Sequence, residues 1–243
     1  GGAEGGGLRV HGVCRRVGRG NGSGRWGLLT NWRRPGFEVT SLWCLDRADY
    51  KWMDANIGRQ WTVPTSWYRR INTIAGFQQQ FTYDGLKNNE DLHAFYGMQF
   101  TNYWNLRAIW IYNPTTEDDR LTRGGPAVMH TGYNLGQVEI STDARKRAVL
   151  DMLVGVAHGV DAPTRTLTLK PGIAFKPMAS VFVQLSPTYQ TDEDAAQYVT
   201  TVPDSTDVAV FCNRYRLGFI KPRPDRPHPR HIWTFPPPLT LQL

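Results

Sequence analysis

The sequence predicts an all-β protein, an antiparallel meander, and its pattern suits either an outer-membrane-type β-barrel, complete or incomplete in this chain, or a soluble β protein. Three observations predict it: apolar and polar residues alternate with a period of two from about residue 59 to 190, the alternating runs are long, and aromatic residues lie near their ends. Ten Phe, ten Tyr and nine Trp among 243 residues exclude general disorder. The longest apolar run, 108–112, is far shorter than the roughly 18 residues of a membrane-spanning helix.

The predicted strands follow one another from the first alternating run to the last. Apolar stripes occupy alternate positions in 71–83, 92–100, 106–112, 148–156, 167–169 and 181–185. Residues typical of turns separate these stripes at 84–85, 88–89, 101–105, 141–145, 158–163, 170–172 and 176–177, and one connection, 113–128, is long. Mixed short and long connections are typical of an antiparallel meander.

Strand length distinguishes two kinds of β protein. Strands of soluble domains average about five or six residues, whereas a strand that crosses a bilayer needs about nine to eleven. The alternating runs here extend to the longer range, and their aromatic ends suit the girdle of a membrane barrel. Aromatic residues also favour strands in any β-sandwich, so a soluble β protein stays an open alternative.

Composition divides the chain into four segments. They are a Gly/Arg-rich low-complexity segment 1–30, an antiparallel β-barrel-like domain 31–213, a Pro/Arg/His-rich segment 214–231 and a final strand remnant 232–243. The formal net charge of +7 comes from the ends, because 1–34 hold seven arginines and one acid, and 214–231 hold six basic residues and one acid. The remainder is net negative, which gives no electrostatic reason to expect nucleic acid as a partner.

Several segments resemble a known family. They are 34–39 (Arg-Pro-Gly-Phe-Glu-Val), 45–49, the run 117–126 with its Arg-Gly-Gly-Pro motif, and the end, 233–236 and 239–243. The chain resembles, over roughly 25–243, the C-terminal domain of large bacterial envelope proteins that carry an N-terminal carbohydrate-binding-module-family-9-like domain followed by an outer-membrane-type β-barrel. The resemblance implies a place in the bacterial cell outer membrane, with outer-membrane lipid or lipopolysaccharide and polysaccharide as partners.

The loop 117–126 holds the densest cluster of charged residues. Its candidate site residues are Glu117, Asp118, Asp119, Arg120, Arg123, Gly124, Gly125 and Pro126. Three adjacent carboxylates suit Ca²⁺, which takes six to eight oxygen ligands, but the neighbouring arginines favour a solvated loop or an ion-pair network. The paired glycines and the proline predict a shaped loop that folds back, and an anion nest is the functional alternative.

Four polar residues within the alternating runs are candidate lumen-facing residues: Arg107, Asp151, Lys170 and Gln184. In a membrane barrel they would face the lumen, because Arg or Lys facing lipid costs about 2–4 kcal/mol near the midplane. In a sandwich they would face water. The histidines and the three cysteines lack metal-site spacing, and no nucleophile motif occurs, so we expect no catalytic residue, no metal and no cofactor.

These observations predict a non-enzymatic outer-membrane β-barrel module that acts as an envelope anchor or channel and is linked to glycan binding or uptake. Two alternatives stay open. One is a soluble β-sandwich that binds carbohydrate through surface Trp and Tyr. The other is a carbohydrate-active hydrolase domain, which requires two carboxylates that face each other across a sugar.

Overall fold

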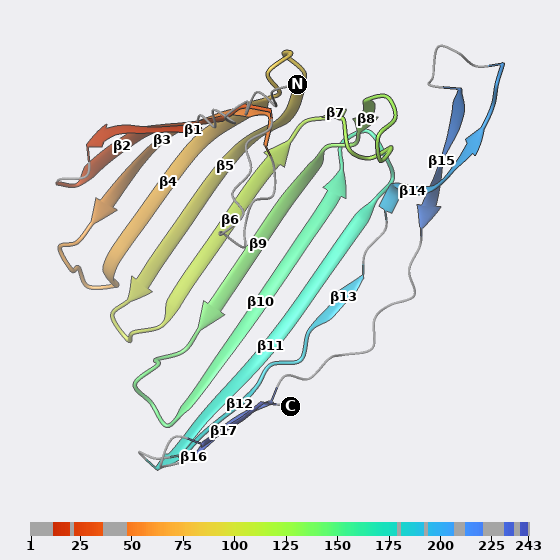
Figure 1. The fold of residues 1–243 in the computed structure, drawn as a ribbon. Helices are drawn as coiled ribbons and strands as arrows, with labels where there is room; N and C mark the ends of the chain where they lie inside the picture. The colour runs from red at the N-terminus through yellow and green to blue at the C-terminus, as the bar shows by residue number, and fades with distance from the viewer. Residues whose placement is uncertain are drawn as a thin grey trace, which may run out of the picture.

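The computed structural model describes residues 12–19, 22–35, 48–178, 181–191, 194–206, 212–220, 231–235 and 239–242. Over these residues the protein is all-β, and most strands belong to one 13-stranded sheet (Figure 1). The strand order is β1-β2-β3-β4-β5-β6-β9-β10-β11-β12-β16-β17, with β13 paired to β11, and every ladder is antiparallel. The predicted all-β antiparallel meander is therefore confirmed.

The strands of the sheet are long in its centre and short towards the C-terminus. Their bounds are β1 (Gly12–Arg19), β2 (Gly24–Arg33), β3 (Tyr50–Trp61), β4 (Tyr68–Phe81), β5 (Lys87–Phe100), β6 (Asn105–Asn113), β9 (Tyr133–Ser141), β10 (Ala148–Gly159), β11 (Arg165–Met178), β12 (Val181–Leu185), β13 (Tyr189–Thr191), β16 (His231–Phe235) and β17 (Leu239–Gln242). A strand of 14 residues, as in β4, β5 and β11, extends about 45 Å at about 3.3 Å per residue.

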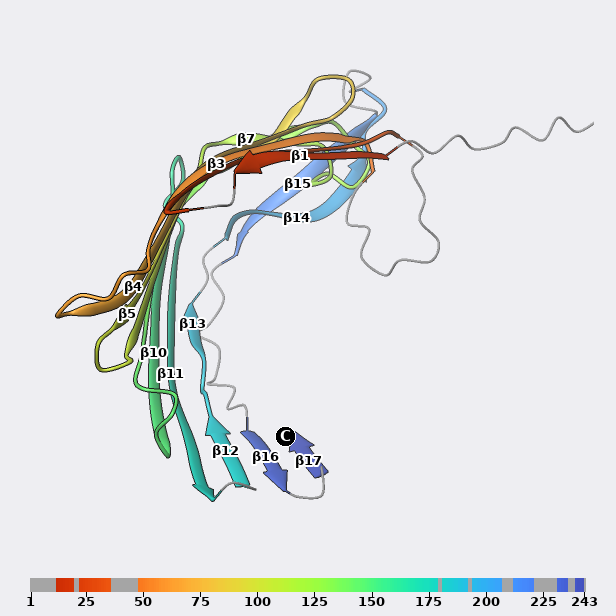
Figure 2. The same cartoon turned by 90° about the vertical axis from the view of Figure 1, so that its left-hand side faces the viewer.

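Two smaller ladders lie outside the main sheet. The strands β7 (Thr116–Asp118) and β8 (Val128–His130) pair within the long connection between β6 and β9. The strands β14 (Asp194–Pro203) and β15 (Asn213–Ile220) form a hairpin beyond the end of β13 (Figure 1). Figure 2 shows the main sheet curling strongly, as the right-handed twist of strands and the bulges in the β4–β5 ladder favour.

The turn predicted at 170–172 is wrong, because β11 runs through it. Pro171 has no backbone N–H and cannot donate a hydrogen bond to a neighbouring strand. A central strand, which has a neighbour on each side, tolerates it only where pairing with one of these neighbours is interrupted. The ladder of β11 with β12 stops at Ile173, and its ladder with β13 starts at Leu169. Within the described residues, Pro171 therefore pairs with Met152 of β10 alone.

The three predicted segment boundaries each fall inside a strand. The boundary between residues 30 and 31 lies in β2, that between 213 and 214 in β15, and that between 231 and 232 in β16. Residues 12–19 and 24–33 form β1 and β2, which the sequence did not predict as strands. Residues 1–11 and most of the proline-rich run, 221–230, lie outside the described residues. The amino-acid composition therefore changes at positions where a strand stays paired with its neighbour.

Candidate functional site

The two faces of the main sheet differ in chemistry. Residues directly opposite each other in an antiparallel ladder share a face, so the register assigns each side chain. One face, called here the apolar face, carries Trp26, Leu28, Ala55, Ile57, Ile71, Ala75, Phe77, Leu92, Ala94, Tyr96, Met98, Leu106, Ala108, Trp110, Val138, Ile140, Leu150, Met152, Val154, Val156, Leu167, Leu169, Ile173, Phe175, Val183 and Leu185. Charged residues interrupt it, Lys51, Arg59 and Glu90 among them, and the guanidinium of Arg59 lies 5.0 Å from a ring centroid of Trp61.

The apolar face is largely uncovered. Ile57 is 68% exposed, Leu150 54% and Phe175 45%. Among the described residues, the buried hydrophobic side chains are Tyr50, Met98 and Ala174 alone. A sheet of a water-soluble domain normally buries its apolar face against a second layer of structure, and the described residues supply no such layer.

The opposite face, called here the polar face, is rich in amides and charges and contains glycines. From β2 to β6 its amide side chains are Asn31, Asn56, Gln60, Asn72, Gln78, Gln80, Asn89, Gln99, Asn105 and Asn113. The register also places all four candidate lumen-facing residues on this face: Arg107, Asp151, Lys170 and Gln184. Nη1 of Arg107 lies 3.4 Å from Oε2 of Glu139 on the neighbouring strand.

A histidine between two carboxylates is the most enclosed polar cluster on this face. His93 Nδ1 lies 2.7 Å from Asp91 Oδ1, and its Nε2 lies 3.7 Å from Asp54 Oδ2. The three side chains are 12–13% exposed. Asn56 donates to Asp54 at 2.7 Å. The ring of His93 occupies the space beside Gly76 that a Cβ would fill. The sequence carried one signal of this cluster, a histidine two residues after an aspartate on the same face.

The charged loop 117–126 is shaped by its own backbone. Asp118 belongs to β7, and its carboxylate accepts the backbone N–H groups of Arg120 and Leu121 at 2.7 and 3.0 Å. Arg123 and Gly124 have positive φ values of 55° and 102°. The carboxylate of Asp118 is therefore used within the loop, and the loop folds back on itself.

The loop 117–126 also packs against the β14–β15 hairpin. The guanidinium of Arg123 lies 4.8 Å from the ring centroid of Tyr198. Gly125 lies so close to the ring of Tyr215 that a Cβ there would overlap it. Thr122 is 1% exposed, and its hydroxyl donates to the carbonyl of Pro126 at 2.8 Å. Of the predicted residues in 117–126, the structure thus assigns Arg123 and Gly125 to a packing contact.

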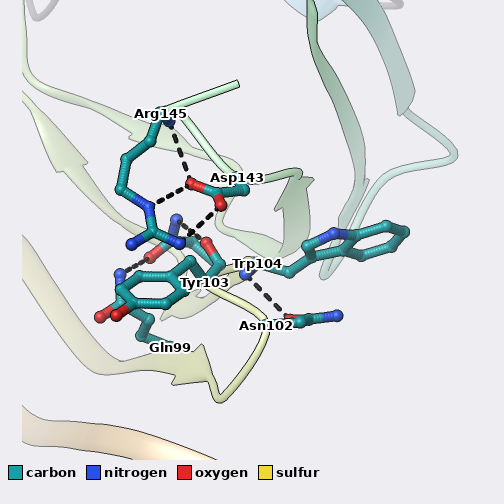
Figure 3. A network of polar contacts seen from close by, with 7 residues as sticks. Gln99, Asn102, Tyr103, Trp104, Asp143 and Arg145 are labelled. Atoms are coloured by element: carbon teal, nitrogen blue, oxygen red, sulfur yellow. Dashed lines mark hydrogen bonds and ion pairs between the residues drawn. The ribbon is translucent and has the colours of Figure 1, made fainter. Parts of the chain in front are cut away.

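A second polar cluster joins two short turns, and the sequence did not predict it (Figure 3). Arg145, in the β9–β10 turn, donates two side-chain hydrogen bonds to Asp143, at 2.9 and 2.8 Å. Tyr103, in the β5–β6 turn, has a positive φ of 67°. Its ring lies beneath the guanidinium of Arg145 and 4.2 Å from that of Arg69. Hydrogen bonds from Arg145 hold the pKa of Asp143 at about 2, below its ordinary value.

The described residues contain neither a metal-binding cluster nor a membrane-spanning helix. No group of three or more His, Cys, Asp or Glu side chains within them is arranged to hold a metal ion. They also include no helix that is long and apolar enough to cross a membrane. Cys44, His11 and His228 lie outside the described residues, as do Asp192 and Glu193 of a second acidic loop.

Comparison with known proteins places the chain in one family. No curated protein and no solved structure gives a significant match. Residues 11–221, most of the chain and most of the main sheet, match a family described as a domain of unknown function. The chain therefore belongs to the DUF5916 family.

Proposed function

We propose that this chain is a non-enzymatic outer-membrane-type β-barrel module of the bacterial cell envelope. The apolar face carries the proposal, because it extends over strands β2 to β12 without a covering layer among the described residues. Exposing apolar surface to water costs about 25 cal/mol per Å², and lipid removes this cost. Strands of 12–14 residues exceed the length that a tilted strand needs to cross a bilayer.

The polar face lines the inside of the curl in this proposal. Side chains inside a curved sheet crowd one another, whereas those outside spread apart. Asp91 and His93 on the polar face are covered by their neighbours, and Ile57 and Leu150 on the apolar face are exposed. A polar interior behind an apolar exterior is the arrangement of a membrane β-barrel, and it offers polar solutes a path.

The ends of the strands give the module a direction. Trp67, Tyr103 and Trp104 lie at the end with the short turns 62–67, 101–104 and 142–147, as expected for an interfacial aromatic girdle. The long connection with β7 and β8 lies at the opposite end. Outer-membrane barrels carry short turns on the periplasmic side and longer loops outside. The charged loop 117–126 would then face outward, towards lipopolysaccharide and polysaccharide, and the module would work beside a glycan-binding domain as an anchor or channel.

Gel mobility of the protein in detergent micelles, with and without boiling, tests this proposal. A closed barrel migrates faster unboiled and shifts on heating, and conductance across a planar bilayer then separates a channel from an anchor. Absence of a shift, together with β-rich circular dichroism in plain buffer, would contradict the proposal. That result would favour the soluble β-sandwich that binds carbohydrate.

A further inference from the structure

A small hollow on the polar face lies where strands β3 to β6 run side by side. Its volume is about 410 Å³, within the range of small-ligand pockets. Seven polar side chains surround it: Gln60, Thr62, Arg70, Asn72, Gln99, Asn105 and Arg107. Gly97 also lines the hollow, and a Cβ built there would meet nothing nearer than the carbonyl oxygen of Asn72, at 4.0 Å. The hollow therefore exists because position 97 has no side chain.

Positive charge around this hollow is not fully compensated. Arg70 makes no ion pair among the described residues, and Arg107 meets Glu139 at the long distance of 3.4 Å with 71% of its side chain exposed. Arg25 lies at the edge, where its Nη2 donates to Asn72 Oδ1. Its Nε is buried without a hydrogen-bond partner. A guanidinium without a carboxylate partner can bind an anion, and Arg presents paired N–H groups that match a carboxylate.

The uncharged side chains around the hollow indicate which kind of anion it would bind. Four amides can donate to and accept from hydroxyl groups, and they already form two long hydrogen bonds with one another, Gln60 with Asn72 at 3.5 Å and Gln99 with Asn105 at 3.3 Å. The lining contains no aromatic ring on which a nucleobase could stack. We propose that the hollow binds a small hydroxylated carboxylate of the sugar-acid class, with the carboxylate on Arg70 and the hydroxyl groups on the amides.

Isothermal titration of the full chain in detergent micelles tests this site with D-galacturonate, D-galactose and inorganic phosphate as probes. Galacturonate should bind, and galactose should bind about tenfold or more weakly, because a hydrogen bond to a charged group adds about that factor. Arg70→Gln should weaken galacturonate binding to the level of galactose. Gly97→Val should abolish binding of both sugars by filling the hollow, and the space around position 97 lets the fold accept the new side chain.

Lys170→Gln is the matched control, because it removes one positive charge from the polar face outside the hollow. It should leave galacturonate binding unchanged. No binding of galacturonate to protein with native circular dichroism would overturn the proposal, as would equal binding of phosphate, which lacks a sugar's hydroxyl groups. The hollow lies within neighbouring strands of one sheet, so this titration can succeed or fail whether or not the sheet closes into a barrel.

Discussion

The guanidinium carbon of Arg145 lies 3.1 Å from the ring centroid of Tyr103, and this contact joins two turns about 40 residues apart in the chain (Figure 3). Asp143 also holds the edge of this guanidinium, through hydrogen bonds at 2.9 and 2.8 Å. A cation above an aromatic face is attracted by the ring electrons. The short-turn end of the sheet is therefore held by a contact between hairpins as well as by strand pairing.

The Asp143–Arg145 pair predicts a pH dependence of stability. The folded-state pKa of Asp143, about 2, lies below the ordinary value of 3.8, so its contribution to stability is complete above about pH 4 and disappears as the pH falls through 2. Asp143→Asn should lower the midpoint of thermal unfolding by a few degrees at pH 5 and by less at pH 2. Circular dichroism of both proteins across this range measures it. Parallel pH curves would contradict the assigned role of the carboxylate.

Packing of His93 against Gly76 predicts different effects for two glycine substitutions. A Cβ at position 76 would collide with the ring of His93 and lie 3.0 Å from the carbonyl oxygen of Ala55, so Gly76→Ala should destabilise by about 1–3 kcal/mol. Gly136→Ala is the control, because no atom lies within 4 Å of its Cβ position. Urea titration of both variants tests the difference, and equal midpoints would refute the placement of His93.

The assignment of the two faces predicts where an added arginine is tolerated. Val154 lies on the apolar face and Thr168 on the polar face of adjacent strands. Val154→Arg should cost about 2–4 kcal/mol in a bilayer and reduce folding into phosphatidylcholine vesicles, whereas Thr168→Arg should have little effect. The yield of the heat-shifted band reports folding. Similar yields for the two variants would argue against a lipid-facing apolar face.

Contact between Gly125 and Tyr215 predicts a coupling between the charged loop and the β14–β15 hairpin. Gly125→Ala should displace the ring of Tyr215 and increase protease cleavage in the β14–β15 hairpin. A double-mutant cycle of Gly125→Ala with Tyr215→Ala should show a coupling free energy of about 0.5–3 kcal/mol, since the two residues touch. Gly124→Ala is the control: its φ of 102° strains any side chain, but no atom lies within 4 Å, so its effect should add to that of Tyr215→Ala.

Local alternation was enough to predict most of the central strands and the membership of their faces. The stripes at 106–112 and 148–156, and the stripe at 71–83 as far as Phe81, follow the observed register, because the period of two is a property of the single extended chain. The first strands were missed for a compositional reason, since a segment rich in Gly and Arg resembles a linker. Pro171 was misread as a turn because its tolerance depends on an interruption in the neighbouring ladder.

The sequence by itself determined an all-β meander, the alternation that makes one face apolar and the other polar, and the residues of the charged loop. These follow from local backbone geometry and the transfer energies of single side chains. Only the tertiary structure decided that His93 lies between Asp91 and Asp54, that Arg145 covers Tyr103, and that Gly97 leaves a hollow beside Arg70. Those relationships depend on strand register and on the meeting of distant turns, which become defined only when the whole sheet assembles.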